Sequence, residues 1–385
     1  MLSAEQVKSF RSRFPIFHKK TYLNSCSQGA LSDQVEAALL EQLRSWHAEG
    51  SPWDLWVEKY EVARATFAKF IGARPDEVAI VSSVSSGVST IASALNFEKR
   101  PKVVMGAYEF PTMGQVWLAQ QSRGAKIHFI EPTEGRIDPE AYAHVVDDKT
   151  LIVPVAHVCF LNGFRSNPKE IVKLAHRHGA LAMLDDYQDV GTRPVNVKDL
   201  DLDFYVAGTL KYLLSPSGAA FLYVRPELIQ KLTPTITGWF AQREPFAFDV
   251  KHFDPAPSAR RFEHGSPAIQ QAYATTAALD LLSGIGFENI AGHIAGLTKA
   301  LLDGARSLGI RAKTPEDSRG PLVVLQMQDI DSMAKRLGDE NLVVSRRMDG
   351  LRISFHAYNT MDDVRTVLGV LEKNIKFATR IPVNA

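Results

Sequence analysis

Leu181-Ala-Met-Leu-Asp-Asp-Tyr-Gln188 and Phe204-Tyr-Val-Ala-Gly-Thr-Leu-Lys211 are the two stretches that decide the fold of this chain of 385 residues. Each begins with a short apolar run that suits a buried parallel strand, and each ends in polar residues. In open α/β sheets, ligands bind beyond the carboxyl ends of the strands. We therefore expect Asp185 and Lys211 to face one crevice.

Further apolar runs predict more strands of the same sheet. They are Glu77–Val81, Lys102–Met105, Ile127–Ile130, Leu151–Val155 and Ala219–Val224. Helical patterns lie between them, such as Pro168 to His178 before Gly179, a residue suited to ending a helix. This alternation predicts an α/β fold with a mostly parallel sheet of seven strands, covered by helices on both faces.

The second half of the chain predicts a smaller unit. Residues 234–266 are rich in proline and lack periodicity, which favours a long functional excursion. Two helices follow, and then a short α/β layer. We expect a large domain over residues 15–265 and a small C-terminal domain over residues 266–385, which also includes residues 1–14.

Composition and charge limit the partners. Hydrophobic residues make up 45% and charged residues 23%, and 44 basic against 43 acidic side chains give a net charge of +1. This balance gives no general attraction for nucleic acid or for an anionic membrane. Cys26 and Cys159 have no ligand spacing, no metal motif is found, and no segment resembles a signal peptide or a membrane span. We expect a cytoplasmic protein without a metal site.

Asp185 and Lys211 together suit a Schiff-base cofactor. A lysine can form an imine, and an aspartate can keep a pyridine nitrogen protonated so that the ring accepts electrons. Either residue alone is more typical of a solvated surface, and only their order and spacing favour chemistry. The apolar neighbours Leu210 and Tyr212 predict a buried Lys211 with a lowered pKa.

At this point the chain resembles the fold-type I pyridoxal-phosphate enzymes of aminotransferase class V, the branch of cysteine desulfurases, kynureninases and isopenicillin N epimerase-like proteins. The resemblance covers nearly the whole chain and rests on segments in the family's order. They are Leu184–Gln188, Asp203–Lys211, Ser217–Val224, Arg261–Pro267 and Leu351–Thr360.

The resemblance implies pyridoxal 5'-phosphate as cofactor and a homodimer with shared active sites. By its motifs, Lys211 matches the imine lysine, Asp185 the partner of the pyridine nitrogen, and Gln188 the neighbour of the ring hydroxyl. The turn Ser82 to Gly87 matches the phosphate site, where helix N-termini suit an anion, and we expect Ser85 and Ser86 to bind there. A serine-rich turn that merely caps a helix is the simpler alternative.

Other positions follow from the same resemblance. Phe110 looks like the aromatic residue that stacks on the cofactor in kynureninase-like members, and Trp239 and Ser266 match residues that the neighbouring subunit donates to the cofactor. Arg352 matches the clamp on the substrate carboxylate, a role suited to a planar, always charged group. Asn24 matches a segment that lines the site.

The chain also departs from desulfurases. Gly208 and Leu210 replace a serine and a histidine that contact the phosphate, so we expect Thr209 to compensate. Residues 343–351 contain no cysteine where desulfurases carry one on a mobile loop, which argues against persulfide chemistry.

The resemblance implies a reaction at the α-carbon of an amino acid, through an external aldimine and a quinonoid. We expect an aminotransferase or a lyase of the C–S type. A kynureninase-type hydrolase, a catalytically silent scaffold on the same fold and a nucleotide-binding α/β protein are the alternatives. Substrate identity stays open.

Overall fold

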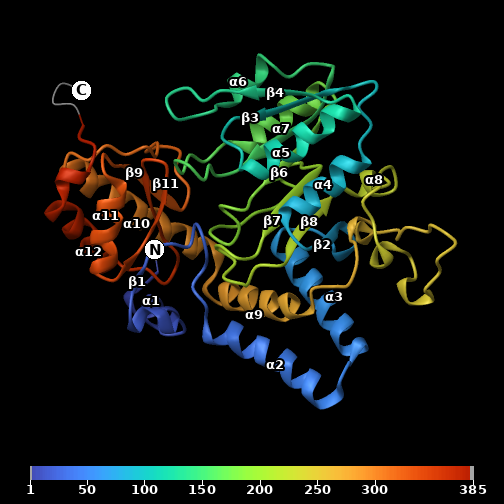
Figure 1. Cartoon of the computed structure of the whole chain (residues 1–385), viewed down its shortest axis with the longest axis horizontal. Coiled ribbons are helices and arrows are strands. Elements are labelled where there is room, and N and C mark those ends of the chain that lie inside the picture. The colour runs from blue at the N-terminus through green and yellow to red at the C-terminus, as the bar shows by residue number, and fades with distance from the viewer. Residues whose placement is uncertain (1, 382–385) are drawn as a thin grey trace.

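A computed structural model describes residues 2–381, and a sheet of seven strands forms its centre (Figure 1). Its strands are β2 (Val78–Val81), β3 (Lys102–Gly106), β4 (Lys126–Ile130), β5 (Thr150–Ala156), β6 (Leu181–Asp185), β7 (Phe204–Gly208) and β8 (Ala220–Val224). The order is β2-β8-β7-β6-β5-β3-β4. Strand β8 runs antiparallel to β2 and β7, and the other neighbouring pairs are parallel. All seven predicted strands and the mostly parallel sheet are confirmed.

The central strands are apolar because both faces of the sheet are covered. On β6, Ala182 and Leu184 face one core cluster and Met183 faces the other. Each fully buried Leu or Met side chain stabilises the fold by roughly 1.5–3 kcal/mol. The sheet therefore holds its strand ends rigidly, which matters for the residues that follow them.

Twelve α-helices lie in the described residues. They are α1 (Ala4–Arg11), α2 (Asp33–Glu49), α3 (Trp53–Phe70), α4 (Val84–Ala94), α5 (Pro111–Ala119), α6 (Pro139–Ala143), α7 (Pro168–Arg177), α8 (Pro226–Ile229), α9 (Ile269–Ile285), α10 (Phe287–Ser307), α11 (Ile330–Asp339) and α12 (Met361–Lys373). Helix α7 ends as predicted, because Gly179 adopts a φ of 64°. Helices α2 and α3, which the sequence patterns did not predict, pack against α9. In residues 2–381, none of these helices has the length and apolarity needed to cross a bilayer.

The C-terminal part forms a smaller layer. Strands β9 (Leu322–Gln326), β11 (Ser345–Arg347) and β12 (Gly350–Ser354) make an antiparallel sheet in the order β11-β12-β9, and this part has a core of its own. Strand β1 (Thr21–Tyr22) pairs in parallel with β10 (Leu342–Val343). Figure 1 accordingly shows the N-terminal segment beside the C-terminal elements. Helix α9 contributes to the core under the large sheet. The division at residue 265 stays a prediction.

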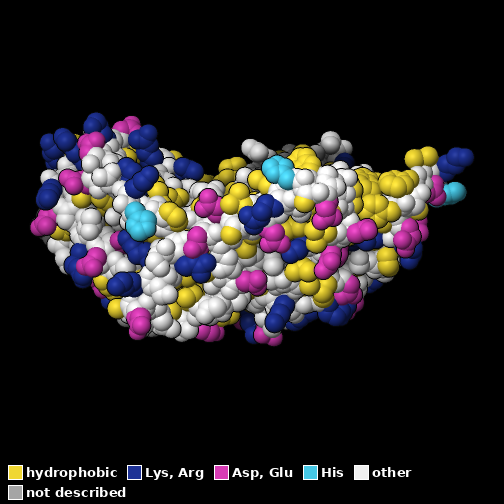
Figure 2. Space-filling model, turned by 90° about the horizontal axis from the view of Figure 1, so that it is seen from below, with side chains coloured by type: hydrophobic (Ala, Val, Ile, Leu, Met, Phe, Trp, Pro, Cys, Tyr) yellow, Lys and Arg dark blue, Asp and Glu magenta, His cyan; other side chains and the backbone are white. Residues whose placement is uncertain are grey.

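Residues 234–266 form the irregular excursion that the prolines predict. Three short 3-10 helices occur there, at Trp239–Ala241, Pro245–Ala247 and Ala259–Phe262. The excursion carries exposed apolar side chains, among them Phe248 at 70% and Val250 at 94% exposure. It projects from one end of the molecule in Figure 1, and Figure 2 shows hydrophobic side chains gathered at that end.

Candidate active site

Asp185 and Lys211 come together at the carboxyl ends of two adjacent parallel strands. Asp185 ends β6 and is paired with Val206 of β7, while Lys211 closely follows β7. Both belong to a small cavity. Its lining is Tyr108, Phe110, Ala156, Val158, Phe160, Asp185, Tyr187, Gln188 and Lys211. The structure thus brings together Phe110, Asp185, Gln188 and Lys211, as expected from the sequence.

Lys211 is a buried amine with little to hold its charge. It is 8% exposed, and no side chain in residues 2–381 accepts a hydrogen bond from its Nζ. Burial lowers the pKa of Lys211 to about 8, against the opposing charge of Asp185. The Nζ lies 4.3 Å from the centroid of the Tyr187 ring and 5.5 Å from that of Phe110. An amine in this setting reaches its uncharged, nucleophilic form near neutral pH.

Asp185 keeps its charge at neutral pH. Burial raises the pKa of its carboxyl group to about 6, and the Tyr187 N–H and the charge of Lys211 limit the rise. That N–H donates to Oδ1 over 3.0 Å. Next to Asp185, Gln188 donates from Nε2 to the Cys26 carbonyl over 3.1 Å, whereas its buried Oε1 has no partner among the described residues. The site therefore holds one anion and one unused acceptor.

Tyr187 is a wall of the cavity that the sequence patterns did not single out. A Cβ on Gly208 would lie 2.0 Å from Cε2 of Tyr187, so position 208 must lack a side chain for this ring to fit. Burial raises the pKa of Tyr187 to about 12, which leaves its hydroxyl neutral. The glycine at position 208, noted above as a departure from the desulfurases, was the available signal for this pair.

Glu109 is a second residue that the patterns missed. Its Oε1 accepts the Ala156 N–H over 2.7 Å, and its buried Oε2 has no partner within residues 2–381. Ala156 lies opposite Asp185 in the sheet. Burial and the charge of Asp185 raise the pKa of Glu109 to about 8. Its position directly before Phe110 was the only sequence signal.

Ser86 forms hydrogen bonds within the chain through both its N–H and its hydroxyl. Helix α4 starts at Val84, and the Ser86 N–H donates to Oγ of the capping residue Ser83 over 3.1 Å. Oγ of Ser86 lies 3.2 Å from Nδ1 of His264, whose Nε2 lies 2.7 Å from Oγ1 of Thr90. Since Thr90 donates to the Ser86 carbonyl, a neutral His264 donates through Nε2 and accepts from Ser86 through Nδ1. Both donors of Ser86 are therefore in use.

Ser85 is the more available hydroxyl of the same turn. It is exposed, and its Oγ lies 2.9 Å from Oγ1 of Thr112 in the first turn of α5. Two helix N-termini thus meet here, an arrangement that suits an anion. Thr209, expected to contact the phosphate, finds no support in this geometry. It is fully buried, and its hydroxyl donates to the carbonyls of Pro216 and Ala219 at 2.7 and 3.2 Å.

Arg352 is buried, with 1% exposure and no carboxylate partner in the described part of the chain. It donates to the Phe160 carbonyl over 3.0 Å, to Oγ of Ser27 over 2.7 Å and to Oγ of Ser345 over 3.1 Å. The N-terminal segment that contains Asn24 therefore reaches Arg352 through Ser27. Asn24 instead lies near Cys26, with 3.9 Å between Oδ1 and Sγ.

Trp239 and Ser266 do not line the cavity of their own chain. The Trp239 ring packs against Phe240, Phe246 and Phe248 in the excursion. Ser266 is exposed. This placement leaves both residues available to a second subunit.

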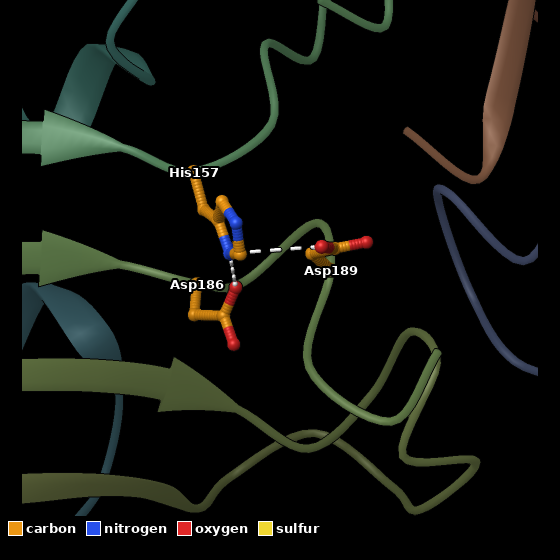
Figure 3. Close-up of side chains that lie close together, drawn as sticks. All are labelled: His157, Asp186 and Asp189. Carbon is orange, nitrogen blue, oxygen red and sulfur yellow. Dashed lines mark hydrogen bonds and ion pairs between the residues drawn. The ribbon is translucent and has the colours of Figure 1, made fainter. Parts of the chain in front are cut away.

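His157, Asp186 and Asp189 form a buried polar cluster next to Asp185 in the sequence and in the sheet. His157 Nδ1 lies 2.6 Å from Asp186 Oδ1 and 3.6 Å from Asp189 Oδ2 (Figure 3). Such a trio can ligate a metal. Here, however, Tyr205 donates to Asp186 over 2.7 Å, and Arg165 forms an ion pair with Asp189 over 2.8 Å. Because donors of the chain itself occupy these oxygens, we interpret the cluster as a structural network. The His157 N–H also donates to the Asp185 carbonyl.

Comparison with known sequences agrees with this geometry. The model of a family described as aminotransferase class-V matches residues 21–367. An uncharacterized aminotransferase of Bacillus subtilis is 34% identical over 359 residues, which cover 93% of this chain and 95% of the relative. A probable cysteine desulfurase of Synechocystis is 28% identical and covers 95% of both chains. A kynureninase of Bacillus mycoides is 25% identical over 97% of this chain and 92% of the relative.

Solved structures confirm the expected fold-type I architecture. The apo cysteine desulfurase of Thermococcus onnurineus superposes with a TM-score of 0.89 at 25% identity, covering 98% of this chain and all of the other. A C-DES variant with glycine covalently linked to its pyridoxal-phosphate cofactor gives 0.87 at 20% identity, covering 94% and 98%.

Proposed function

Because this chain belongs to the aminotransferase class-V family, we propose that Lys211, Asp185 and Arg352 carry out amino-acid chemistry with pyridoxal 5'-phosphate. The protein is a pyridoxal-phosphate enzyme of the aminotransferase or lyase type. Within that class we propose an aminotransferase.

The residues around the cavity fit this cofactor. A free buried amine, a charged carboxylate and the unpartnered Oε1 of Gln188 converge there. The family's roles suit them: Lys211 for the covalent bond, Asp185 for the pyridine nitrogen and Gln188 for the ring hydroxyl. The rings of Phe110 and Tyr187 both lie near the Lys211 amine and line the cavity. When bound, pyridoxal phosphate supplies an electron-withdrawing ring that stabilises negative charge at the α-carbon of an attached amino acid.

The phosphate fits the first turn of α4. The helix N-terminus favours an anion. The Ser85 side chain is exposed, and its hydroxyl lies within hydrogen-bond distance of the Thr112 hydroxyl. We assign the phosphate to Ser85 with the backbone of this turn, and we assign Ser86 a supporting role because its donors are occupied.

The observation that carries the proposal is that the buried amine of Lys211 lines the same cavity as Asp185. With its pKa lowered to about 8, the Nζ can take a proton from the substrate α-carbon and return it nearby. Among the residues that line the cavity, no other side chain is a base of similar strength near neutral pH. Transamination needs this two-way transfer by one base.

Arg352 suits the substrate carboxylate. Its guanidinium is buried and receives no counter-charge from residues 2–381, so an incoming carboxylate supplies what the site lacks. Ser27 and the Phe160 carbonyl fix its orientation through hydrogen bonds. We expect this clamp to hold the α-carbon over the Lys211 amine.

We further propose a homodimer with shared sites. Leu40, Leu43 and Trp46 on α2 and the apolar residues of the excursion are exposed, and patches of this kind mark protein interfaces. Trp239 and Ser266 would then reach the partner's cofactor. We also propose a cytoplasmic location, because Cys26 and Cys159 are both free thiols, as is typical of proteins in a reducing compartment.

Persulfide chemistry is not part of the proposal. Residues 345–354 form the β11–β12 hairpin, which holds arginine and methionine but no cysteine. A kynureninase-type hydrolase and a silent scaffold stay as alternatives.

Single-turnover chemistry tests the proposal. The purified enzyme is mixed with one amino acid at a time, and the products are identified by mass spectrometry. An aminotransferase releases the 2-oxo acid and leaves the amino form of the cofactor without free ammonia. Ammonia with a released β-substituent indicates a lyase, and alanine from kynurenine indicates a hydrolase. Binding of cofactor without any turnover, equal in Lys211→Ala, supports a scaffold.

A further inference from the structure

The β11–β12 hairpin places a second arginine on the same face as Arg352. Ser345 is paired with Arg352, and Arg347 is paired with Gly350. Side chains opposite each other in an antiparallel pair share one face, and so do alternate residues of one strand. Arg347 therefore lies on the face where Arg352 contacts Ser345 and Ser27.

Arg346, the neighbour of Arg347 in the chain, lies on the opposite face of the hairpin. Leu351 packs into the core of the C-terminal layer, and Arg346, which is paired with it, forms an ion pair with Asp331 at the start of α11. Arg346 is thus neutralised on the opposite face, whereas Arg347 lies on the face that carries Arg352.

Arg347 has no acidic partner among residues 2–381. Its Nη1 donates to the Arg346 carbonyl over 2.8 Å, and its side chain is exposed. The closest acidic residue in the hairpin, Asp349, is held by Lys313 and Gln326. An exposed arginine without a counter-charge near a catalytic cavity is available to a ligand.

The charges around the cavity are unbalanced as a result. Arg352 donates to the carbonyl of Phe160, a residue that lines the cavity, and the strand register puts Arg347 on the face of the hairpin that carries Arg352. Partial desolvation of this largely exposed side chain and the charge of Arg352 lower the pKa of Arg347. Asp185 is the charged acid at the cavity, since Glu109 has its pKa raised to about 8 and is neutral at pH 7. One substrate carboxylate on Arg352 leaves Arg347 without a partner.

We propose that Arg347 binds the side-chain carboxylate of the substrate, so that the enzyme acts on acidic amino acids and the matching dicarboxylic 2-oxo acids. This inference rests on the proposed function, because it assigns the α-carboxylate to Arg352. A charge-assisted contact of this kind discriminates an acid from its isosteric amide by roughly ten- to hundredfold.

Matched substrate pairs test the inference. We expect aspartate over asparagine, or glutamate over glutamine, to be favoured by roughly ten- to hundredfold in kcat/KM. Arg347→Met should bring the acid and the amide to within a few-fold of each other, and Arg346→Met, on the opposite face, should keep the preference. Equal use of acid and amide by the natural enzyme, or a preference that survives in Arg347→Met, overturns the inference.

A binding measurement separates this inference from the proposed function. Calorimetry compares succinate and glutarate with butyrate and valerate, which lack the second carboxylate. If the dicarboxylates bind more tightly and this gain depends on Arg347, the carboxylate site is supported. If in addition no amino acid is turned over, the proposed function is refuted but the carboxylate site is not. If Arg347→Met leaves this binding unchanged and weakens the dimer instead, Arg347 is an interface residue and the inference fails.

Discussion

The Nζ of Lys211 lies 4.3 Å from the centroid of the Tyr187 ring, and that ring occupies the space that a side chain at position 208 would need. Tyr187, Gly208 and Lys211 therefore form one steric unit. Its strand-end residues are held by the buried sheet, so the unit has little room to adjust.

We predict that Gly208→Ala displaces the Tyr187 ring. The added Cβ would meet Cε2 at 2.0 Å, and such overpacking costs about 1–3 kcal/mol of stability and weakens cofactor binding. Urea unfolding and cofactor titration measure both effects. In the double variant with Tyr187→Ala, the loss should be smaller than the sum of the single losses. Gly369→Ala, at an open helical position, is the control and should not destabilise the protein. Additive losses would refute the steric unit.

Ser85 and Ser86 should differ in their effects on the cofactor. Ser85→Ala removes an available hydroxyl and should weaken cofactor binding by about 1 kcal/mol, close to tenfold. Ser86→Ala should leave that affinity within a factor of about two and lower the stability instead, because its hydroxyl donates to His264. Fluorescence titration of the apoprotein with pyridoxal phosphate compares the two. The reverse order would restore Ser86 as the phosphate ligand.

The buried amine of Lys211 should cost stability when the cofactor is absent. The pKa of Lys211 falls from 10.5 to about 8 on folding. Above pH 10.5 the neutral amine therefore costs the folded protein no stability. Stability is lost as the pH falls through 8, where the buried amine must take up a proton. At pH 7 the apoprotein of Lys211→Met should be more stable than the natural apoprotein by roughly 3 kcal/mol.

Urea unfolding at pH 7 and at pH 10.5 checks this expectation. The gain should shrink toward zero at the higher pH, because the lysine is then neutral in the folded state and already half neutral in the unfolded state. Lys231→Met, at an exposed position, should show no such dependence. A Lys211→Met apoprotein without added stability at pH 7 would mean that the amine is solvated.

Glu109 should make stability depend on pH in the opposite sense. Folding raises the pKa of Glu109 from 4.5 to about 8. Below pH 4.5 the carboxyl group is protonated in both states and costs no stability. Stability is lost as the pH rises through 8, where the buried group must ionise. Glu109→Gln keeps the acceptor for the Ala156 N–H without the ionisation. Its stability relative to the natural protein should therefore rise by at least about 1 kcal/mol between pH 5 and pH 9.

Thermal unfolding of the apoproteins across this range measures the difference. Glu58→Gln, at an exposed position, serves as the control. Parallel pH profiles for Glu109→Gln and the natural protein would show that Glu109 is ionised throughout.

Local patterns were enough to predict the sheet. The apolar runs before Asp185 and Lys211 predict buried strands, and strand ends in a parallel sheet converge whatever the details of packing. Helices α2 and α3 were not predicted, and they are held by packing against α9, which is distant in sequence. Thr209 was expected at the phosphate because it carries a hydroxyl, but the turn after β7 buries it against backbone carbonyls.

By itself, the sequence determined the seven strands of the central sheet, the family, and the lysine and aspartate that share one crevice. These depend on residue types at fixed spacing, which the chain carries along its length. Only the tertiary structure decided that Tyr187 fills the space at Gly208, that Ser86 is engaged by His264, and that Arg347 shares the face of Arg352. Each of these is a contact or a shared orientation between side chains, and which atoms meet is set by packing and strand register rather than by local preference.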